Sequence, residues 1–317
     1  MEQYEFGIQR RVVAHKTSEA WLNTPHVSVL VEFDVTAVQA FIHRIAQHPD
    51  FRNIRVTLNS VMLKIIGNAM KHSPVMNAHI TYNKRTSIGA MSVSQDVNIA
   101  VPLRSADGRM ITPVLQQVNQ KSLREVCEGM QDIKRRVANT NVDLLLLEAG
   151  LGDTWERLRK GQIITVLQRL YSNFIGSAKL SLPSREERRA YEKIPPQDRI
   201  TAKDLLCATT LVSNIGSLMP ELEAYFGLLE IIPPHTTAIG LAAARKKPVA
   251  VTDNQDMDRV DVREIMPASV CFDHRAMDYE HIVGFLGEVL RLCRAPEELL
   301  ANGSPPPAGR FPRNCAK

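Results

Sequence analysis

A histidine and an aspartate near the C-terminal end of the chain have the spacing of a catalytic pair. In the stretch SVCFDHRAMDYEHIVGFL (269–286), a strand-like apolar run ends in Asp-His-Arg, and Asp278 follows His274 by four residues. Histidine is the usual general base near neutral pH because its reference pKa is about 6.5. On a helix the two side chains would share one face, whereas at a strand-to-loop junction the histidine would point into a cleft. The spacing alone leaves open whether the pair is catalytic or only a charged corner where a strand turns into a helix.

The composition is that of a globular protein with a substantial core. Hydrophobic residues make up 44% and charged residues 23% of the 317 positions. Lys and Arg exceed Asp and Glu by 39 to 34, which suits an anionic small molecule, but they lack the clustering with aromatic residues that nucleic-acid binding needs. The longest apolar runs fall short of the ~20 residues of a membrane span. Neither a nucleic acid nor a membrane span is therefore expected.

The cysteines and the N-terminal stretch predict the compartment. The five cysteines form no C-x-x-C pair and their total is odd, which indicates reduced thiols in a cytoplasmic protein. Cys271 and Cys293 lie among apolar residues, and we expect them to pack in the core. The opening stretch MEQYEFGIQRRVVAHK has no apolar segment of the kind that signal peptides contain.

Alternating strand and helix patterns predict an α/β fold with a mixed sheet covered by helices. Stretches such as HVSVLVEFDV alternate and are β-branched, as strands are, and Ser122 and Glu125 have the spacing of a helix capping box. Thr36 is expected to cap the helix that follows it. We expect strands in 26–35, 78–83, 87–103, 111–118, 208–214, 234–251 and 261–274, and helices in 8–22, 37–48, 57–73, 122–139 and 279–294. The last helix is expected to pack on the sheet through Ile282, Phe285, Leu286, Val289, Leu290 and Cys293.

The chain is expected to form one domain over residues 1–300. Residues 141–205 mix short helical patterns with basic and proline-containing segments, and they are predicted to be a helical insertion within that domain. Residues 301–317 are basic and rich in proline and glycine, which predicts a disordered tail.

The sequence around His274 resembles a known enzyme family. PASVCFDHRAMDYEHIVGFLGEVLRLCRAPEELL is similar to the closing segment of the dihydrolipoamide acyltransferase catalytic domains of 2-oxo acid dehydrogenase complexes, where a strand ends in D-H-R-x-x-D-G and a helix follows. LNSVMLKIIGNAMKHSPVMNAHI, DVNIAVPLRSADGRMITPVLQQVNQKSLREV, TTLVSNIGS and IPPHTTAIGLAAARKKPVAV resemble further phrases of that family in the same order. The matches cover residues 8–140 and 206–300.

The resemblance implies a fold and a set of site residues. The fold is a two-layer α/β sandwich of chloramphenicol acetyltransferase type, assembled as a homotrimer with active sites between subunits. His274 is implied as the general base that deprotonates an acceptor thiol, and Asp278 as the residue that supports it. Ser213 of the neighbouring subunit is implied as the hydroxyl donor to the tetrahedral oxyanion. Arg275 is expected to hold local charge pairs.

The resemblance also implies substrates and partners. Coenzyme A takes part as acyl-CoA, and the acceptor is either a dihydrolipoyl-type thiol or another group. The catalytic segment starts almost at Met1, so we expect no lipoyl group on this chain, and a lipoyl-domain or carrier protein would have to supply one in trans. Two alternatives stay open: a catalytically weak trimeric scaffold or regulator, and a small-molecule O- or N-acyltransferase.

The sequence departs from the family in three places. Tyr279 stands where the motif has a glycine, a residue that permits tight turns, so we expect either a differently shaped loop or a ring that reaches into the site. The 141–205 insertion is expected to influence the choice of acceptor, as a lid or a docking surface. The tail runs past the usual C-terminus of the family, which favours a trimer over a large cage.

Some further residues are expected to be structural. Without the family context, Ser213 and the following Asn214 would be a turn. His26 is expected to have a structural role, and His235 to lie exposed in a rigid Pro-Pro-His loop. Residues 244–248 (ARKKP) could reach the phosphates of coenzyme A, although a solvated run of charges is the commoner case. Trp21 and Trp155 are expected to be packing residues.

Overall fold

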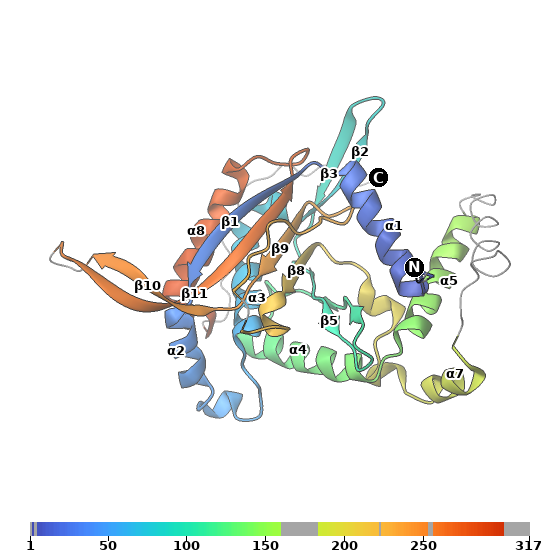
Figure 1. Ribbon diagram of the computed structural model, residues 1–317, viewed down its shortest axis with the longest axis horizontal. Coiled ribbons are helices and arrows are strands. Elements are labelled where there is room, and N and C mark those ends of the chain that lie inside the picture. Colours follow the sequence, from blue (N-terminus) through green and yellow to red (C-terminus); the bar gives the residue numbers. More distant parts are fainter. Residues whose placement is uncertain (1, 3–4, 160–182, 222, 253–255, 301–317) are drawn as a thin grey trace.

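A mixed β-sheet forms the centre of the protein in a computed structural model that describes residues 2, 5–159, 183–221, 223–252 and 256–300. Within these residues the sheet has seven strands in the order β1–β11–β9–β8–β4–β7, and β10 pairs with the first half of β11 (Figure 1). The strands are β1 (His26–Asp34), β4 (Ile99–Ala100), β7 (Val114–Leu115), β8 (Thr210–Asn214), β9 (Thr237–Leu241), β10 (Arg245–Thr252) and β11 (Asp258–Asp273). β8 runs parallel to β4 and β9, and the other neighbours are antiparallel.

Helices cover one face of this sheet, as the sequence predicts. α2, α3, α4 and α8 pack against one another and against the strands. Two short hairpins, β2–β3 and β5–β6, stand outside the sheet, and the β10–β11 hairpin extends away from the body at the left of Figure 1. The helices and outer strands are α1 (Ile8–Asn23), α2 (Thr36–Ile45), α3 (Leu58–Ala69), β2 (Ala78–Asn83), β3 (Ile88–Val93), β5 (Leu103–Arg104), β6 (Met110–Ile111), α4 (Leu123–Ala138), α5 (Val142–Arg159), α7 (Arg185–Glu192) and α8 (Glu280–Arg294).

Apolar side chains cover both faces of the sheet. On the helix side, Val212 of β8 belongs to the main core. On the opposite face, Ala238 of β9 and Cys271 of β11 form a smaller cluster with the segment that precedes β9. Because consecutive residues of a strand point to opposite faces, Ser213 lies on the same face as this smaller cluster.

The predicted elements are present, with differences of detail. The capping box of Ser122 and Glu125 begins α4, which confirms that prediction. The prediction that Thr36 caps α2 is wrong, because Thr36 is the first helical residue and the carboxylate of Asp34 accepts its backbone N–H at 2.9 Å. Leu290 is exposed, in contrast to its predicted packing, because it lies at the margin of the buried stripe of α8.

The predicted helical insertion at 141–205 contains α5, α7 and two short 3-10 turns in its described part. Residues 160–182, and the tail at 301–317, lie outside the described residues. The division into a domain at 1–300 and a disordered tail therefore stays a prediction. No helix in the described ranges is long and apolar enough to cross a membrane.

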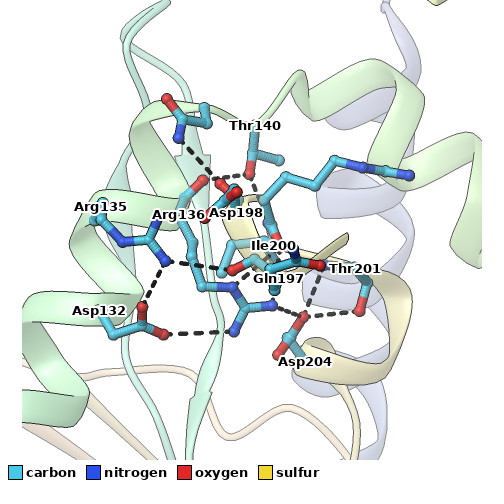
Figure 2. Close-up of polar contacts among 11 residues, drawn as sticks. Asp132, Arg135, Arg136, Thr140, Gln197, Asp198, Ile200, Thr201 and Asp204 are labelled. Atoms are coloured by element: carbon cyan, nitrogen blue, oxygen red, sulfur yellow. Dashed lines mark hydrogen bonds and ion pairs between the residues drawn. The ribbon is translucent and has the colours of Figure 1, made fainter. Parts of the chain in front are cut away.

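A polar network fastens the end of this segment to α4 (Figure 2). The guanidinium of Arg136 donates to the backbone oxygen of Arg199 at 2.9 Å and to the carboxylate of Asp204 at 2.6 Å. The hydroxyl of Thr140 accepts the backbone N–H of Ile200 at 2.8 Å. Because Arg136 is mostly buried, these charge-assisted bonds are shielded from water. They hold in place the chain that leads into β8, the strand that carries Ser213.

One lysine of the core makes no ion pair within the described residues. Lys64 of α3 is buried, and its ammonium donates to the backbone oxygen of Val118 at 3.0 Å. Burial disfavours the charged form and lowers the pKa of Lys64 to about 8. In the unfolded chain the same group titrates near a pKa of about 10.4. Folding at neutral pH therefore bears the cost of a buried charge at this position.

We expect the substitution Lys64→Met to raise the free energy of unfolding at pH 7 by about 1–2 kcal/mol, because removal of the buried charge outweighs the lost hydrogen bond. Below pH 8 the lysine is charged in both the folded and the unfolded state, so folding carries the full free-energy cost of burying this charge. Between about pH 8 and 10.4 the folded state releases its proton first, so the advantage of the variant should shrink across this range. Urea unfolding at several pH values measures the difference. Lys203→Met, at an exposed position, is the control, and a pH-independent gain would contradict the prediction.

Candidate active site

His274 lies at the turn that follows the last residue of β11. Its backbone N–H donates to the oxygen of Pro25 at 2.9 Å, which ties the turn to the start of β1. The edge of the Phe272 ring faces the imidazole, with ring centroids 6.2 Å apart. The side chain of His274 is 52% exposed. It is therefore held at its base by the sheet but remains open to solvent in the isolated chain.

The imidazole has a defined orientation. Its Nδ1 lies 3.2 Å from Oδ1 of Asp278 and 3.3 Å from the backbone oxygen of Met277. Both neighbours are acceptors, so Nδ1 carries the proton and donates it to them. Within the described part of the chain no hydrogen bond occupies Nε2. The lone pair of Nε2 is thus available to accept a proton from a substrate.

A buried ion pair lies directly beside the histidine. The side chain of Asp273 is 0% exposed, and that of Arg275 is 18% exposed. The guanidinium of Arg275 donates to both carboxylate oxygens of Asp273, at 3.0 and 2.6 Å, and the backbone N–H of Arg275 adds a bond of 2.9 Å. The guanidinium also lies 5.5 Å above the ring centroid of Tyr82 in β2, a cation–π distance. The prediction that Arg275 holds a local charge pair is confirmed.

Ser213 lies near the end of β8 and is half-buried. It is therefore part of a strand and not of a turn. It is paired in register with Gly240 of β9, where a Cβ atom would lie 2.5 Å from the ring of Phe226. The absence of a side chain at Gly240 lets this aromatic ring lie flat against the sheet beside the serine. No side-chain hydrogen bond occupies the hydroxyl of Ser213 within the described residues.

The strand register separates Ser213 from His274 within one chain. Gly240, the partner of Ser213, is itself paired with Ser269 of β11. Ser213 therefore lies two strands away and five residues short of His274 along the strand direction, a separation of about 19 Å. One carbonyl group cannot contact a base and a hydroxyl donor that are so far apart.

Tyr279 has an ordinary backbone conformation. Its φ of -54° and ψ of -39° lie in the right-handed helical region, and it directly precedes the first residue of α8. The turn therefore does not use a positive φ at this position, and tyrosine causes no backbone strain there. The ring of Tyr279 is exposed.

Two of the expectations for other aromatic residues are wrong. Trp21 is 67% exposed and stacks on His26 with ring centroids 6.1 Å apart, so it is not a core residue. His235 is half-buried, and its Nε2 donates to the backbone oxygen of Ala208 at 3.0 Å; burial lowers its pKa. His79 donates to the same oxygen at 2.8 Å. Trp155 lies where no side chains are described.

The expectations for His26, Cys271 and Cys293 are confirmed. Nε2 of His26 accepts the backbone N–H of Ile231 at 3.0 Å, a structural bond, and burial lowers the pKa of this histidine. Cys271 and Cys293 are buried. In the basic run 244–248, the ammonium of Lys247 bonds to the carboxylate of Glu32 at 2.5 Å. No group of three or more metal-ligating side chains lies close together in the described ranges.

The comparison with known protein families decides the relationship of this chain. The family described as 2-oxoacid dehydrogenases acyltransferase (catalytic domain) matches residues 2–144 and 185–301, which is more than half of the chain. The chain belongs to this family. The family and the acyltransferase class that the sequence predicts are thereby confirmed. The unmatched segment, 145–184, is shorter than the predicted insertion at 141–205.

Curated relatives of this acyltransferase family are similar over most of the chain. The dihydrolipoyllysine-residue acetyltransferase component of the pyruvate dehydrogenase complex of Zymomonas mobilis is 26% identical over 296 residues, which are 92% of this chain and 50% of that protein. The dihydrolipoyllysine-residue succinyltransferase component of the 2-oxoglutarate dehydrogenase complex of Bacillus subtilis is 20% identical over 306 residues, 96% of this chain and 55% of that protein. The chain spans about half the length of these relatives.

Solved structures of acyltransferase cores have the same fold. The cubic core of a pyruvate dehydrogenase multienzyme complex has a TM-score of 0.64 at 17% identity, covering 95% of this chain and 94% of that chain. The dihydrolipoamide acetyltransferase of Azotobacter vinelandii has a TM-score of 0.63 at 18% identity with the same coverage. The predicted two-layer α/β fold of chloramphenicol acetyltransferase type is confirmed.

We expect the substitution Arg275→Met to destabilise the protein by about 3–5 kcal/mol, because the carboxylate of Asp273 would be left buried without its cation. Chemical unfolding followed by tryptophan fluorescence measures the loss. Arg263→Met is the matched control, since its ion pair with Asp261 is partly exposed and should contribute less than about 1 kcal/mol. Equal losses in the two variants would show that burial of the Asp273 pair has no special effect.

Proposed function

We propose that this protein transfers acyl groups between coenzyme A and an acceptor thiol, with His274 as the general base. The observation that supports this assignment is the orientation of the imidazole, whose Nδ1 is engaged by Asp278 and Met277 while Nε2 has no hydrogen-bond partner among the described residues. A histidine held in this way can remove a proton at neutral pH. Asp278 acts as a positioning residue, because its carboxylate fixes the tautomer of the ring.

The reaction proceeds through a tetrahedral intermediate. Nε2 of His274 takes the proton of the acceptor thiol, and the thiolate attacks the carbonyl carbon of the thioester. The carbonyl oxygen becomes an oxyanion, which accepts a hydrogen bond from the hydroxyl of Ser213. When the intermediate collapses, the bond to the sulfur of coenzyme A breaks, and the leaving thiolate takes the proton back from the imidazolium. The reverse sequence of steps loads coenzyme A.

The site is proposed to form between two subunits of a homotrimer. Within one chain His274 and Ser213 are about 19 Å apart, whereas both must lie about 3 Å from the same reacting group. A neighbouring copy that brings its Ser213 to His274 removes this conflict. The exposure of the His274 side chain in a single chain agrees with a site that another subunit completes.

The acetyltransferase of Azotobacter vinelandii supports the residue assignment. In that enzyme a serine, a histidine and an asparagine four residues after the histidine have been investigated for their role in the catalytic mechanism. This chain has Ser213, His274 and, four residues after the histidine, Asp278. A carboxylate in place of an amide can accept a hydrogen bond from the N–H at Nδ1 but cannot donate a hydrogen bond to that nitrogen. This favours the tautomer of His274 that carries its proton on Nδ1.

A dihydrolipoyl thiol is the proposed acceptor. The relatives in Zymomonas mobilis and Bacillus subtilis are named for dihydrolipoyllysine residues and are about twice as long as the matched region. We propose that a lipoyl-domain or carrier protein supplies the acceptor in trans, in the cytoplasm.

Mixing two inactive variants tests the shared site. Ser213→Ala should lower the rate of acyl transfer about 100- to 1,000-fold, through loss of the oxyanion donor, and His274→Ala should abolish it. When the two variants assemble at random from equal amounts, about one quarter of the sites in the whole population of trimers combine an intact His274 with an intact Ser213. Co-expressed, differently tagged subunits should therefore regain about a quarter of the wild-type rate of thiol release from acyl-CoA.

Four outcomes would contradict this assignment. If the hybrids are no more active than the Ser213→Ala protein, His274 and Ser213 do not come from different subunits to form one active site. Full activity of the His274→Ala protein would exclude His274 as the general base. Absence of turnover with every acyl-CoA donor would favour a trimeric scaffold or regulator. Transfer to amine or hydroxyl acceptors, with none to dihydrolipoamide, would instead indicate a small-molecule acyltransferase.

A further inference from the structure

A small apolar hollow opens beside the end of β8. It has a volume of about 210 Å³ and begins two residues after Ser213. Leu218 and Met219 at its rim are exposed in the isolated chain. The side chains and backbone around it come from the turn after β8, the following loop and the residues after β9, and they are Ile215, Gly216, Leu218, Met219, Ala224 and Ala243.

We propose that this hollow is the acyl-binding subsite and that it selects an apolar chain of several carbons over acetyl and over carboxylate-ended acyl groups. The inference rests on the proposed function, in which the hydroxyl of Ser213 holds the oxygen of the thioester carbonyl. An acyl chain attached to this carbonyl would then extend along the residues that follow Ser213, where the hollow begins.

The size of the hollow fits an acyl group and not a whole coenzyme A molecule. Pockets for drug-sized ligands have volumes of about 300–1,000 Å³, more than the 210 Å³ found here. If one methylene fills about the volume of a water molecule, near 30 Å³, the hollow holds a chain of about four to seven carbons. An acetyl group would leave most of it empty.

The polarity of the hollow disfavours a terminal carboxylate. Among the residues that the structure describes, its lining contains no charged side chain. The nearest cations, Arg245 and Lys247, line a separate space of about 20 Å³, which is too small for a carboxylate. Lys247 is already paired with Glu32, and a terminal nitrogen of Arg245 donates to the oxygen of Pro220 at 2.9 Å. A carboxylate in the apolar space would lose its hydration without a compensating partner.

The walls of the hollow are held in place before any substrate binds. Asn214 accepts the backbone N–H of Ser217 at 3.2 Å and donates to the side chain of Asn59 at 2.9 Å, which fixes the turn. A Cβ atom on Gly216 would lie 2.5 Å from the backbone of Ala243, so only glycine lets the two walls approach this closely. On the outer side, the hydroxyl of Tyr225 donates to Glu32 of β1 at 2.7 Å.

Binding of coenzyme A thioethers to the full-length protein tests the subsite without turnover. We expect S-hexyl-coenzyme A to bind at least tenfold more tightly than S-ethyl-coenzyme A in titration calorimetry, since each buried methylene adds up to about fourfold in affinity. A thioether that carries a terminal carboxylate in a chain of similar length should bind no more tightly than the ethyl compound. Equal affinities for the ethyl and hexyl compounds, or tightest binding of the carboxylate, would overturn the proposal.

A variant that fills the hollow provides the second test. Ala224→Phe should fill the hollow and remove the preference for the hexyl compound over the ethyl compound. Ala40→Phe, on the exposed face of α2, is the matched control and should keep the hexyl preference. If Ala224→Phe keeps this preference, the chain binds elsewhere and the proposal is wrong.

The two proposals fail in different ways. A hexyl preference that Ala224→Phe abolishes, in a protein that turns over no acyl-CoA, would retain the subsite and overturn the proposed function. His274-dependent turnover with no chain-length preference would retain the function and overturn the subsite. If neither thioether binds, both are wrong.

Discussion

The buried pair of Asp273 and Arg275 is the interaction on which the site depends. A carboxylate with 0% exposure at the end of β11 is stable only with a cation and hydrogen-bond donors beside it. Arg275 supplies the cation and a backbone N–H to this carboxylate. The backbone oxygen of Asp273 in turn accepts the backbone N–H groups of Ala276 and Met277 at 2.9 and 3.2 Å, which closes the turn. His274 stands inside this closed turn, so its backbone has little freedom, and the carbonyl of Met277 lies where it can engage Nδ1. A charge that is costly to bury thus fixes the direction of the proposed base.

The order of strands explains why one chain holds only part of the proposed site. β11 is antiparallel to β9, and β9 is parallel to β8, so the C-terminal end of β11 lies at the opposite edge from the C-terminal end of β8. His274 follows the first of these ends, and Ser213 lies near the second. No local rearrangement of a loop can join them, because both are anchored to the same sheet. The division of the site between subunits is therefore a consequence of topology in this proposal.

The sequence predicts the fold and names the proposed base and donor, because alternation, helical periodicity and the D-H-R phrase are local patterns. It does not predict which residues meet across the fold. The ring of Tyr82 in β2 packs against the guanidinium of Arg275, and the ring of Phe226 lies next to Gly240 of β9. No local sequence pattern indicates either contact. Nor does the sequence predict the partner of the buried Lys64, whose ammonium donates to a carbonyl 54 residues away. At Tyr279, where the motif has a glycine, the sequence predicts a differently shaped loop or a ring that reaches into the site, but it does not show that the backbone there is helical, a conformation that tyrosine adopts without strain.

Catalysis by fixed dipoles needs a site from which water is excluded, because a hydrogen bond to an oxyanion contributes far less in bulk solvent. In one chain both halves of the proposed site are wet, since the His274 side chain is 52% exposed and the apolar rim beside Ser213 is exposed as well. An arrangement that joins the two halves would cover both at once. The apolar side chains of Leu218 and Met219, which are exposed in the isolated chain, would then be covered at the rim of the proposed acyl subsite. Assembly would supply the missing hydroxyl and the dry environment in the same step.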